Sequence, residues 1–219
     1  MNNHKIKIYF SDQYPGIKLM EMTNSNIDLL LLPQEHTSYL KNEKAGNEYS
    51  KKAGIYILIG KNNDDGKKYA YIGQTKELLK RIEQHRKDVK IKDDFNLKQD
   101  FNYLIFISTI NNLLGSTERF YIEKQLIESA NLNSDFKVIN ENYGTHSNVN
   151  SKEAGVYNQF INNIKKLLII IGEDIFQTKT NNIQEIIVNT KIIDDSITTT
   201  YNEKNKLYLK DSENNNYYA

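Results

Sequence analysis

The chain contains no cysteine and no tryptophan, and only two prolines among its 219 residues. Without cysteine it has no disulfide, no thiolate metal site and no cysteine nucleophile, so a metal site must use Glu, Asp, His or water. Neither sign of charge is in excess, because 29 Lys and Arg face 28 Asp and Glu for a net charge of +1. No field of the whole protein therefore attracts DNA or an anionic membrane, and any nucleic-acid contact must come from a local patch.

Long apolar runs are also missing. The longest, residues 29–32 and 167–171, are far shorter than the roughly 20 apolar residues that cross a bilayer. The first residues, MNNHKIKIYF, lack the continuous apolar segment of a signal peptide. We therefore expect a cytoplasmic protein without a transmembrane helix.

The hydrophobic patterning predicts an α+β chain with the central order β-β-α-β-α. Alternating polar and apolar residues predict strands, and apolar residues spaced as on one helix face predict helices. Thr75 and Ser116 or Thr117 are the expected N-caps of the two central helices. The predicted strands are 5–10, 17–22, a hairpin over 54–75, and 101–109, with strand-like patterning after 177; the predicted helices are 34–44, 74–89, 116–130 and 151–176.

The predicted hairpin carries a tyrosine near the end of each strand, Tyr56 in GIY (54–56) and Tyr71 in YIG (71–73). By itself this pattern is typical of a sheet edge with aromatic packing. Arg81 and His85 follow at i,i+4 spacing and share one helix face, where a guanidinium and an imidazole can bind phosphate oxygens. A solvated basic face is the alternative, because Lys80 and two further basic residues, Arg86 and Lys87, flank the pair.

Glu123 lies on the next predicted helix, between the apolar residues Ile122 and Leu126. This position is consistent with the edge of the core, where a carboxylate can bind a hard divalent cation together with water. A helical glutamate without a role is the alternative. Glu118 and Glu128, on the same helix, are useful controls because neither takes part in the pattern.

The order of these residues resembles that of the GIY-YIG nuclease superfamily, and in particular a bacterial branch. The branch shares a first strand like KIKIYF, a stretch comparable to residues 16–21 and the pattern L-K-R-x-x-Q-H at 79–85. The likeness covers residues 1 to about 178. It implies a small central antiparallel sheet flanked by helices, divided into an N-terminal α/β preface (1–50), a GIY-YIG domain (51–150), a packing helix (151–178) and the start of a truncated β-rich C-terminal domain (179–219).

The resemblance implies a DNA endonuclease that depends on Mg²⁺ or Mn²⁺. In this interpretation Glu123 binds the metal, Arg81 stabilises the transition-state charge, and Tyr56 helps to deprotonate the attacking water once nearby positive charge lowers its pKa. The catalytic set would be Tyr56, Tyr71, Arg81, His85, Glu123 and Asn140. Asn142 fits the last position as well as Asn140 does, although the branch pattern favours Asn140. Gly73, at a tight turn beside the phosphate, and Lys80, Arg86 and Lys87 would contact nucleic acid.

The sequence does not identify the target. We expect DNA, single- or double-stranded, as the partner, and a second protein or a dimer that supplies specificity, with a role in genome defence or repair. Two alternatives remain: an inactive nucleic-acid-binding module and a protein-interaction scaffold. The complete set of five residues, Tyr56, Tyr71, Arg81, His85 and Glu123, favours the nuclease, because a decayed site would be expected to lose at least one of them.

Overall fold

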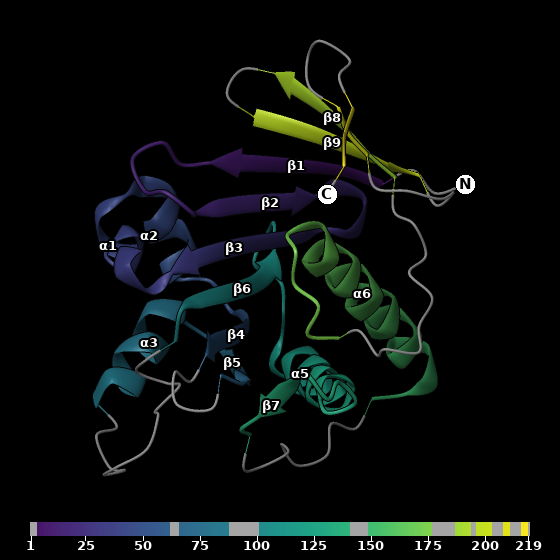
Figure 1. Ribbon diagram of the computed structural model, residues 1–219. Helices are drawn as coiled ribbons and strands as arrows, with labels where there is room; N and C mark the ends of the chain where they lie inside the picture. Colours follow the sequence, from purple (N-terminus) through teal and green to yellow (C-terminus); the bar gives the residue numbers. More distant parts are fainter. Residues whose placement is uncertain are drawn as a thin grey trace.

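The computed structural model describes residues 4–61, 66–87, 101–140, 149–176, 187–193, 196–202, 208–210 and 216–218 (Figure 1). The strands are β1 His4–Phe10, β2 Lys18–Met22, β3 Ile27–Pro33, β4 Gly54–Lys61, β5 Lys68–Thr75, β6 Tyr103–Thr109, β7 Phe136–Val138, β8 Ile187–Ile193, β9 Ser196–Asn202, β10 Tyr208–Lys210 and β11 Asn216–Tyr218. The α-helices are α1 Tyr39–Asn42, α2 Lys44–Ser50, α3 Leu78–Lys87, α5 Ser116–Ala130 and α6 Ser151–Ile170. Up to residue 140 the described strands and α-helices follow in the order β1, β2, β3, α1, α2, β4, β5, α3, β6, α5 and β7.

Within the described residues, nine strands form one sheet in the order β7-β5-β4-β6-β3-β2-β1-β9-β8. Neighbouring strands are antiparallel except for β5 and β7, which pair in parallel. The predicted α+β class, an antiparallel central sheet flanked by helices, is confirmed. The N-terminal strands continue this sheet, because β3 pairs with β6 along its whole length. The domain boundaries predicted from the sequence stay a prediction.

Each face of the sheet is covered by its own helices. On one face, α5 and α6 pack on apolar side chains that include Ile57, Ile72 and Ile107. On the other, α1, α2 and α3 pack on a second cluster that includes Tyr56 and Phe106 (Figure 1). Because side chains alternate along a strand, consecutive residues of β5 serve opposite faces. This alternation places the hairpin tyrosines under α3.

Several local predictions were wrong. Helix α3 begins at Leu78, and Thr75 is instead the last residue of β5, where its hydroxyl accepts a hydrogen bond from the Glu77 amide. The N-cap of α5 is Gly115, not Ser116 or Thr117. Helix α6 ends at Ile170, well before residue 176. Strand β7, at the start of a polar, Asn-rich segment, was not predicted.

In the part of the chain that the structure describes, no helix is both long enough and apolar enough to span a membrane.

Candidate active site

Gly54 of GIY and Gly73 of YIG both lie where a side chain would meet an aromatic ring. A side chain at Gly73 would overlap the ring and hydroxyl of Tyr56, which lies opposite it in the β4–β5 pair. A side chain at Gly54 would overlap the ring of Phe106 on β6. Neither glycine has a positive φ. Gly73 is therefore required because the Tyr56 ring crosses the strand, and Gly54 because the Ile107 carbonyl and the Phe106 ring approach its Cα, not because the backbone turns at either glycine.

This finding corrects the reason expected for Gly73. The residue lies inside β5, buried and extended, and no tight turn occurs there. Its place beneath the Tyr56 ring gives it a packing role instead. The expectation of a direct phosphate contact at Gly73 stays a prediction.

The Tyr56 hydroxyl joins two residues of α3. Arg81 Nε donates a hydrogen bond of 2.9 Å to Tyr56 Oη, and His85 Nε2 lies 2.8 Å from the same oxygen. Tyr56 is fully buried and His85 is 2% exposed, so neither group is solvated by bulk water. The i,i+4 spacing of Arg81 and His85 on α3 brings both to one phenol oxygen. The predicted neighbourhood of Tyr56, Arg81 and His85 is present in the structure.

Burial keeps Tyr56 a phenol. It raises the pKa of Tyr56 well above its usual value of 10, the neighbouring Tyr71 raises it further, and the Arg81 charge only partly opposes these effects. We expected nearby positive charge to lower this pKa enough for Tyr56 to act as a base. The Arg81 charge alone does not lower this pKa, because the cost of burying a phenolate exceeds the attraction of one guanidinium. The role of Tyr56 as a base beside a bound cation stays a prediction.

Tyr71 is the more accessible tyrosine. Its side chain is half-buried, its ring centroid lies 6.0 Å from that of Tyr56 and 5.7 Å from that of His85, and it hydrogen-bonds to Tyr56. The two hydroxyls and the imidazole thus form a connected polar group that runs from a partly exposed end at Tyr71 to a buried end at His85.

Glu123 reaches the same strand from the other face of the sheet. Its half-buried carboxylate on α5 accepts a hydrogen bond from the backbone N–H of Gln74, and the charge of Arg81 acts on it. This contact is possible because β7 pairs with β5 only over residues 68–70, so among the described residues no strand pairs with the last residues of β5 on that side. At this position α5, on one face of the sheet, places the Glu123 carboxylate within the influence of Arg81, which lies on α3 on the opposite face.

Burial also changes the Glu123 carboxyl, raising its pKa to about 7, while the Gln74 amide and Arg81 act in the opposite direction. The described residues contain no cluster of three or more His, Asp or Glu side chains able to enclose a metal ion. A single partly buried carboxylate does suit a hydrated Mg²⁺ or Mn²⁺, since hard cations of this kind commonly keep several water ligands and bind through one or two carboxylates and substrate phosphates. The donor set at Glu123 therefore fits the cation that the sequence predicts.

Asn140 supports β5 where β7 has ended. Its Nδ2 donates to the carbonyl of Ile72 at 2.5 Å and its Oδ1 accepts from the Ile72 amide at 3.1 Å. The amide side chain therefore replaces a strand partner for the residue between Tyr71 and Gly73. In this position Asn140 orients the YIG strand. Asn142, the alternative, lies outside the described residues.

The basic residues predicted to contact nucleic acid are less closely associated with this group. Lys80 and Arg86 are exposed on α3, and Arg86 Nη2 donates to Thr37 Oγ1 at 2.6 Å. The structure describes the backbone of Lys87 but not its side chain. The nucleic-acid contacts expected of all three stay predictions.

The sequence analysis did not predict a role for two residues beside Glu123, Arg119 and Gln74. Arg119, one turn earlier on α5, is 4% exposed and donates from Nε to Gln74 Oε1 at 3.1 Å and from Nη1 to the Leu114 carbonyl at 2.5 Å. Gln74 thus binds α5 twice, through its side chain to Arg119 and through its backbone to Glu123. The i,i+4 spacing of Arg119 and Glu123 was the available signal, but an arginine near a helix start is ordinarily solvated.

Comparison with known families agrees with this arrangement. Residues 52–132 match the profile described as the GIY-YIG catalytic domain. The matched segment contains both tyrosines, Arg81, His85 and Glu123, and ends before Asn140. Searches of curated proteins and of solved structures found no match. The match and the fold together place a GIY-YIG domain of the nuclease superfamily in this chain.

Proposed function

We propose that this chain, which carries a GIY-YIG nuclease domain at residues 52–132, is a metal-dependent DNA endonuclease that hydrolyses phosphodiester bonds. The observation that carries the proposal is the meeting of Tyr56, Arg81 and His85 at one phenol oxygen, with the Glu123 carboxylate within the influence of Arg81. A scaffold that merely retained the fold would have no need of this buried polar group, whose desolvation costs stability unless every partner is in place.

Arg81 is the group that binds the phosphate. Its guanidinium has five N–H donors; Nε is held by Tyr56 at 2.9 Å and Nη1 contacts Gln84 Oε1 at 3.3 Å. The bond to Tyr56 fixes the plane of the guanidinium, so its remaining donors are oriented before the substrate arrives. Preorganised donors of this kind stabilise the extra negative charge of the transition state.

The tyrosines and His85 move the proton of the attacking water. Tyr71, at the partly exposed end, takes the water proton as it donates its own to Tyr56, and Tyr56 donates its proton to His85 Nε2. The water oxygen forms a bond to phosphorus as the bond to the leaving oxygen breaks, and the proton ends on the imidazole. This route requires His85 to be neutral with Nε2 as the acceptor, and it requires no phenolate.

Glu123 would hold the cation. A Mg²⁺ or Mn²⁺ bound there supplies a positive charge that polarises a phosphoryl oxygen and stabilises the leaving oxygen. A role in genome defence or repair, and a partner that selects the target, belong to the same proposal.

One experiment separates this proposal from its alternatives. The protein is incubated with single-stranded DNA, duplex DNA and RNA, each with Mn²⁺ or with EDTA. Cutting of DNA that EDTA abolishes supports the endonuclease. Salt-sensitive binding without cutting would support the inactive nucleic-acid-binding module, and neither cutting nor binding would support the scaffold.

A further inference from the structure

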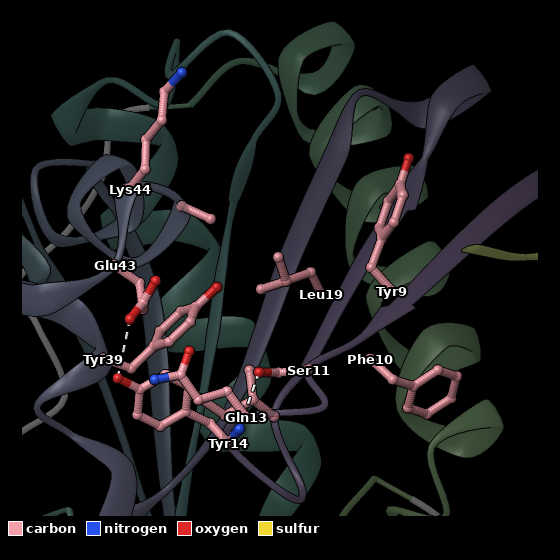
Figure 2. Close-up of a pocket in the computed structure, with 11 residues that line it drawn as sticks. Tyr9, Phe10, Ser11, Gln13, Tyr14, Leu19, Tyr39, Glu43 and Lys44 are labelled. Carbon is pink, nitrogen blue, oxygen red and sulfur yellow. Dashed lines mark hydrogen bonds between the residues drawn. The ribbon is translucent and has the colours of Figure 1, made fainter. Parts of the chain in front are cut away.

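A second site lies apart from the catalytic group, between the β1–β2 turn and helices α1 and α2. It is a hollow with a volume of about 270 Å³, whose lining includes Tyr9, Phe10, Tyr14, Tyr39, Glu43 and Lys44 (Figure 2). At about 30 Å³ per water molecule, it has room for about nine waters. A nucleobase, with a similar number of non-hydrogen atoms, fits the same space.

The lining is aromatic and keeps its shape without a ligand. Tyr14 packs edge-to-face on Tyr39 and on His36, with ring centroids 5.4 and 5.6 Å away. Its hydroxyl donates to Glu43 Oε1 at 3.0 Å, as Figure 2 shows. Tyr9 and Tyr14 are half-buried, so part of each side chain is open to solvent, whereas the Phe10 ring points away from Tyr14 and Tyr39 (Figure 2). Stacking on such rings favours flat heterocycles and tolerates every base, because each base has a π-face.

The negative charge of Glu43 determines which part of a nucleic acid the hollow can bind. The Glu43 carboxylate lies among the rings and repels a phosphate. It accepts hydrogen bonds from N–H groups, and every base has such a donor on its Watson–Crick edge. That edge is available only when the base is unpaired. The hollow is therefore suited to an unpaired base and not to duplex DNA or to the phosphate backbone.

The hollow and the catalytic tyrosine share one face of the sheet. Tyr9, at the hollow, begins a row of residues that stand opposite one another in successive strand pairs and ends at Tyr56; the row is Tyr9, Leu19, Leu30, Phe106 and Tyr56. Four strand spacings of ~4.8 Å separate its ends, or roughly 19 Å. Because α1, α2 and α3 cover this row, a single strand would pass over these helices, and its path is longer than this separation.

Exposed lysines lie on the helices that cover this face of the sheet. Lys80 lies on α3, the helix that carries Arg81. Lys41 on α1 contacts Glu83 of α3 with Nζ 2.7 Å from Oε1, and its side chain is still 56% exposed. Lys44 stands at the hollow itself. Lys44 and Lys80 are exposed, and each can neutralise a phosphate of a bound strand.

We propose that this hollow binds an unpaired nucleobase of the nucleic-acid strand whose backbone lies at Arg81. The proposal rests on the proposed nuclease function for the identity of the strand, but the hollow can bind a base whether or not the catalytic group is active. It predicts that single-stranded DNA, or a duplex with a single-stranded extension, binds more tightly than blunt duplex of the same length.

The test measures binding separately from cutting. Fluorescence anisotropy of labelled single-stranded and blunt duplex oligonucleotides is recorded in EDTA, where no cutting is expected. Stacking is worth about 1–3 kcal/mol per base, so Tyr14→Ala is expected to weaken single-strand binding by roughly 5- to 150-fold and to leave duplex binding unchanged. Tyr14→Phe, which keeps the ring, should retain most of the affinity. Tyr157→Ala, on the opposite face of the sheet, is the matched control and should change neither.

A second measurement keeps the proposal falsifiable if Tyr14→Ala does not fold. A single strand containing 5-iodouracil is photo-crosslinked to the unaltered protein, and adducts are expected on the peptides that carry Tyr9, Tyr14 or Tyr39. Adducts confined to other peptides, or equal single-strand affinity in Glu43→Gln, Tyr9→Ala and the unaltered protein, would overturn it. Binding of free deoxynucleotides at the hollow without binding of single strands would also overturn it and assign the site to a mononucleotide.

The result does not depend on whether DNA is cut. If no DNA is cleaved but single-strand binding requires Tyr14 and Glu43, the proposed catalysis fails and the base site stands. If DNA is cleaved and the hollow variants bind single strands normally, the catalysis stands and the base site fails.

Discussion

Gly73 lies opposite Tyr56 in the β4–β5 ladder, and the ring of Tyr56 occupies the space that a side chain at position 73 would need. The same ring carries the hydroxyl that Arg81 and His85 contact. The glycine of YIG and the tyrosine of GIY therefore depend on each other, and the position of the Tyr56 phenol is set by the absence of one methyl group on the neighbouring strand.

Replacing Gly73 with alanine should displace the Tyr56 ring. We expect Gly73→Ala to lower the free energy of unfolding by about 1–3 kcal/mol, as overpacking of a filled core does, and to reduce cleavage strongly because the hydroxyl leaves Arg81 and His85. Chemical denaturation and single-turnover cleavage measure the two effects. In a Tyr56→Ala background the same substitution should cost little stability, since the overlapping ring is gone.

Gly155 provides the control for that experiment. It is exposed on α6, and nothing lies within 4 Å of where its Cβ would be. Gly155→Ala should stabilise the protein by about 0.5–1 kcal/mol, as alanine does in a helix interior, without changing cleavage. An equally neutral Gly73→Ala would contradict the packing role given to Gly73.

Removing one hydroxyl at a time tests the path of the proton. Tyr71→Phe and Tyr56→Phe should each reduce the single-turnover rate by about 10²–10⁴-fold, the usual size of a general acid–base contribution. Tyr56→Phe should destabilise the fold more than Tyr71→Phe does, because it removes the buried hydroxyl that His85 Nε2 and Arg81 Nε both contact. Normal cleavage by Tyr71→Phe would remove that tyrosine from the path.

The pH dependence of stability tests the environment of Glu123. Burial raises its pKa from 4.5 to about 7, so the folded protein holds a proton that the unfolded chain releases near pH 4.5. The stability associated with that proton is complete below pH 4.5 and is lost as the pH rises to 7. Without metal, Glu123→Gln should therefore raise the melting temperature relative to wild type at pH 8 and change it little at pH 4.

Glu128 is the matched control, because it lies on the same helix but is exposed and pairs with Lys124. Glu128→Gln should show no such trend across the same pH range. Because a bound cation requires the ionised carboxylate, Mg²⁺ should stabilise the wild-type protein more at pH 8 than at pH 6. A difference between wild type and Glu123→Gln that does not vary with pH would show that Glu123 is not buried as described.

We expect the Asn140 side chain to affect stability and cleavage by holding β5 in place. Loss of its two hydrogen bonds to Ile72 in Asn140→Ala is expected to cost about 1–3 kcal/mol of stability and to slow cleavage without weakening metal binding. Asn140→Asp should be no better, since a carboxylate cannot donate to the Ile72 carbonyl. Titration with Mn²⁺ and thermal melts provide the measurements, with exposed Asn158→Ala as the control. Weaker metal binding in Asn140→Ala would give this residue a different role.

Much of the site could be predicted because its geometry is local. Arg81 and His85 meet at one oxygen because four residues are slightly more than one helical turn, and Tyr56 and Tyr71 are brought together by a hairpin. Secondary structure with strong periodicity, such as β1, β4 and α5, was predicted to within about two residues for the same reason.

What the sequence did not predict depends on contacts between distant segments. The raised pKa of Tyr56 follows from burial beneath α3, which no spacing reveals. Strand β7 has three residues, too few for an alternating pattern, and is stabilised by its parallel pairing with β5. The double contact of Gln74 with α5, to Arg119 and Glu123, likewise exists only once the helix has packed across the sheet edge.

The measurement that tests the account most directly is single-turnover cleavage of DNA in Mn²⁺ by wild type, Glu123→Gln and Glu128→Gln, each shown to be folded at the assay temperature. The account predicts that Glu123→Gln loses nearly all cleavage while Glu128→Gln cuts at the wild-type rate. Cleavage by folded Glu123→Gln at the wild-type rate would contradict it.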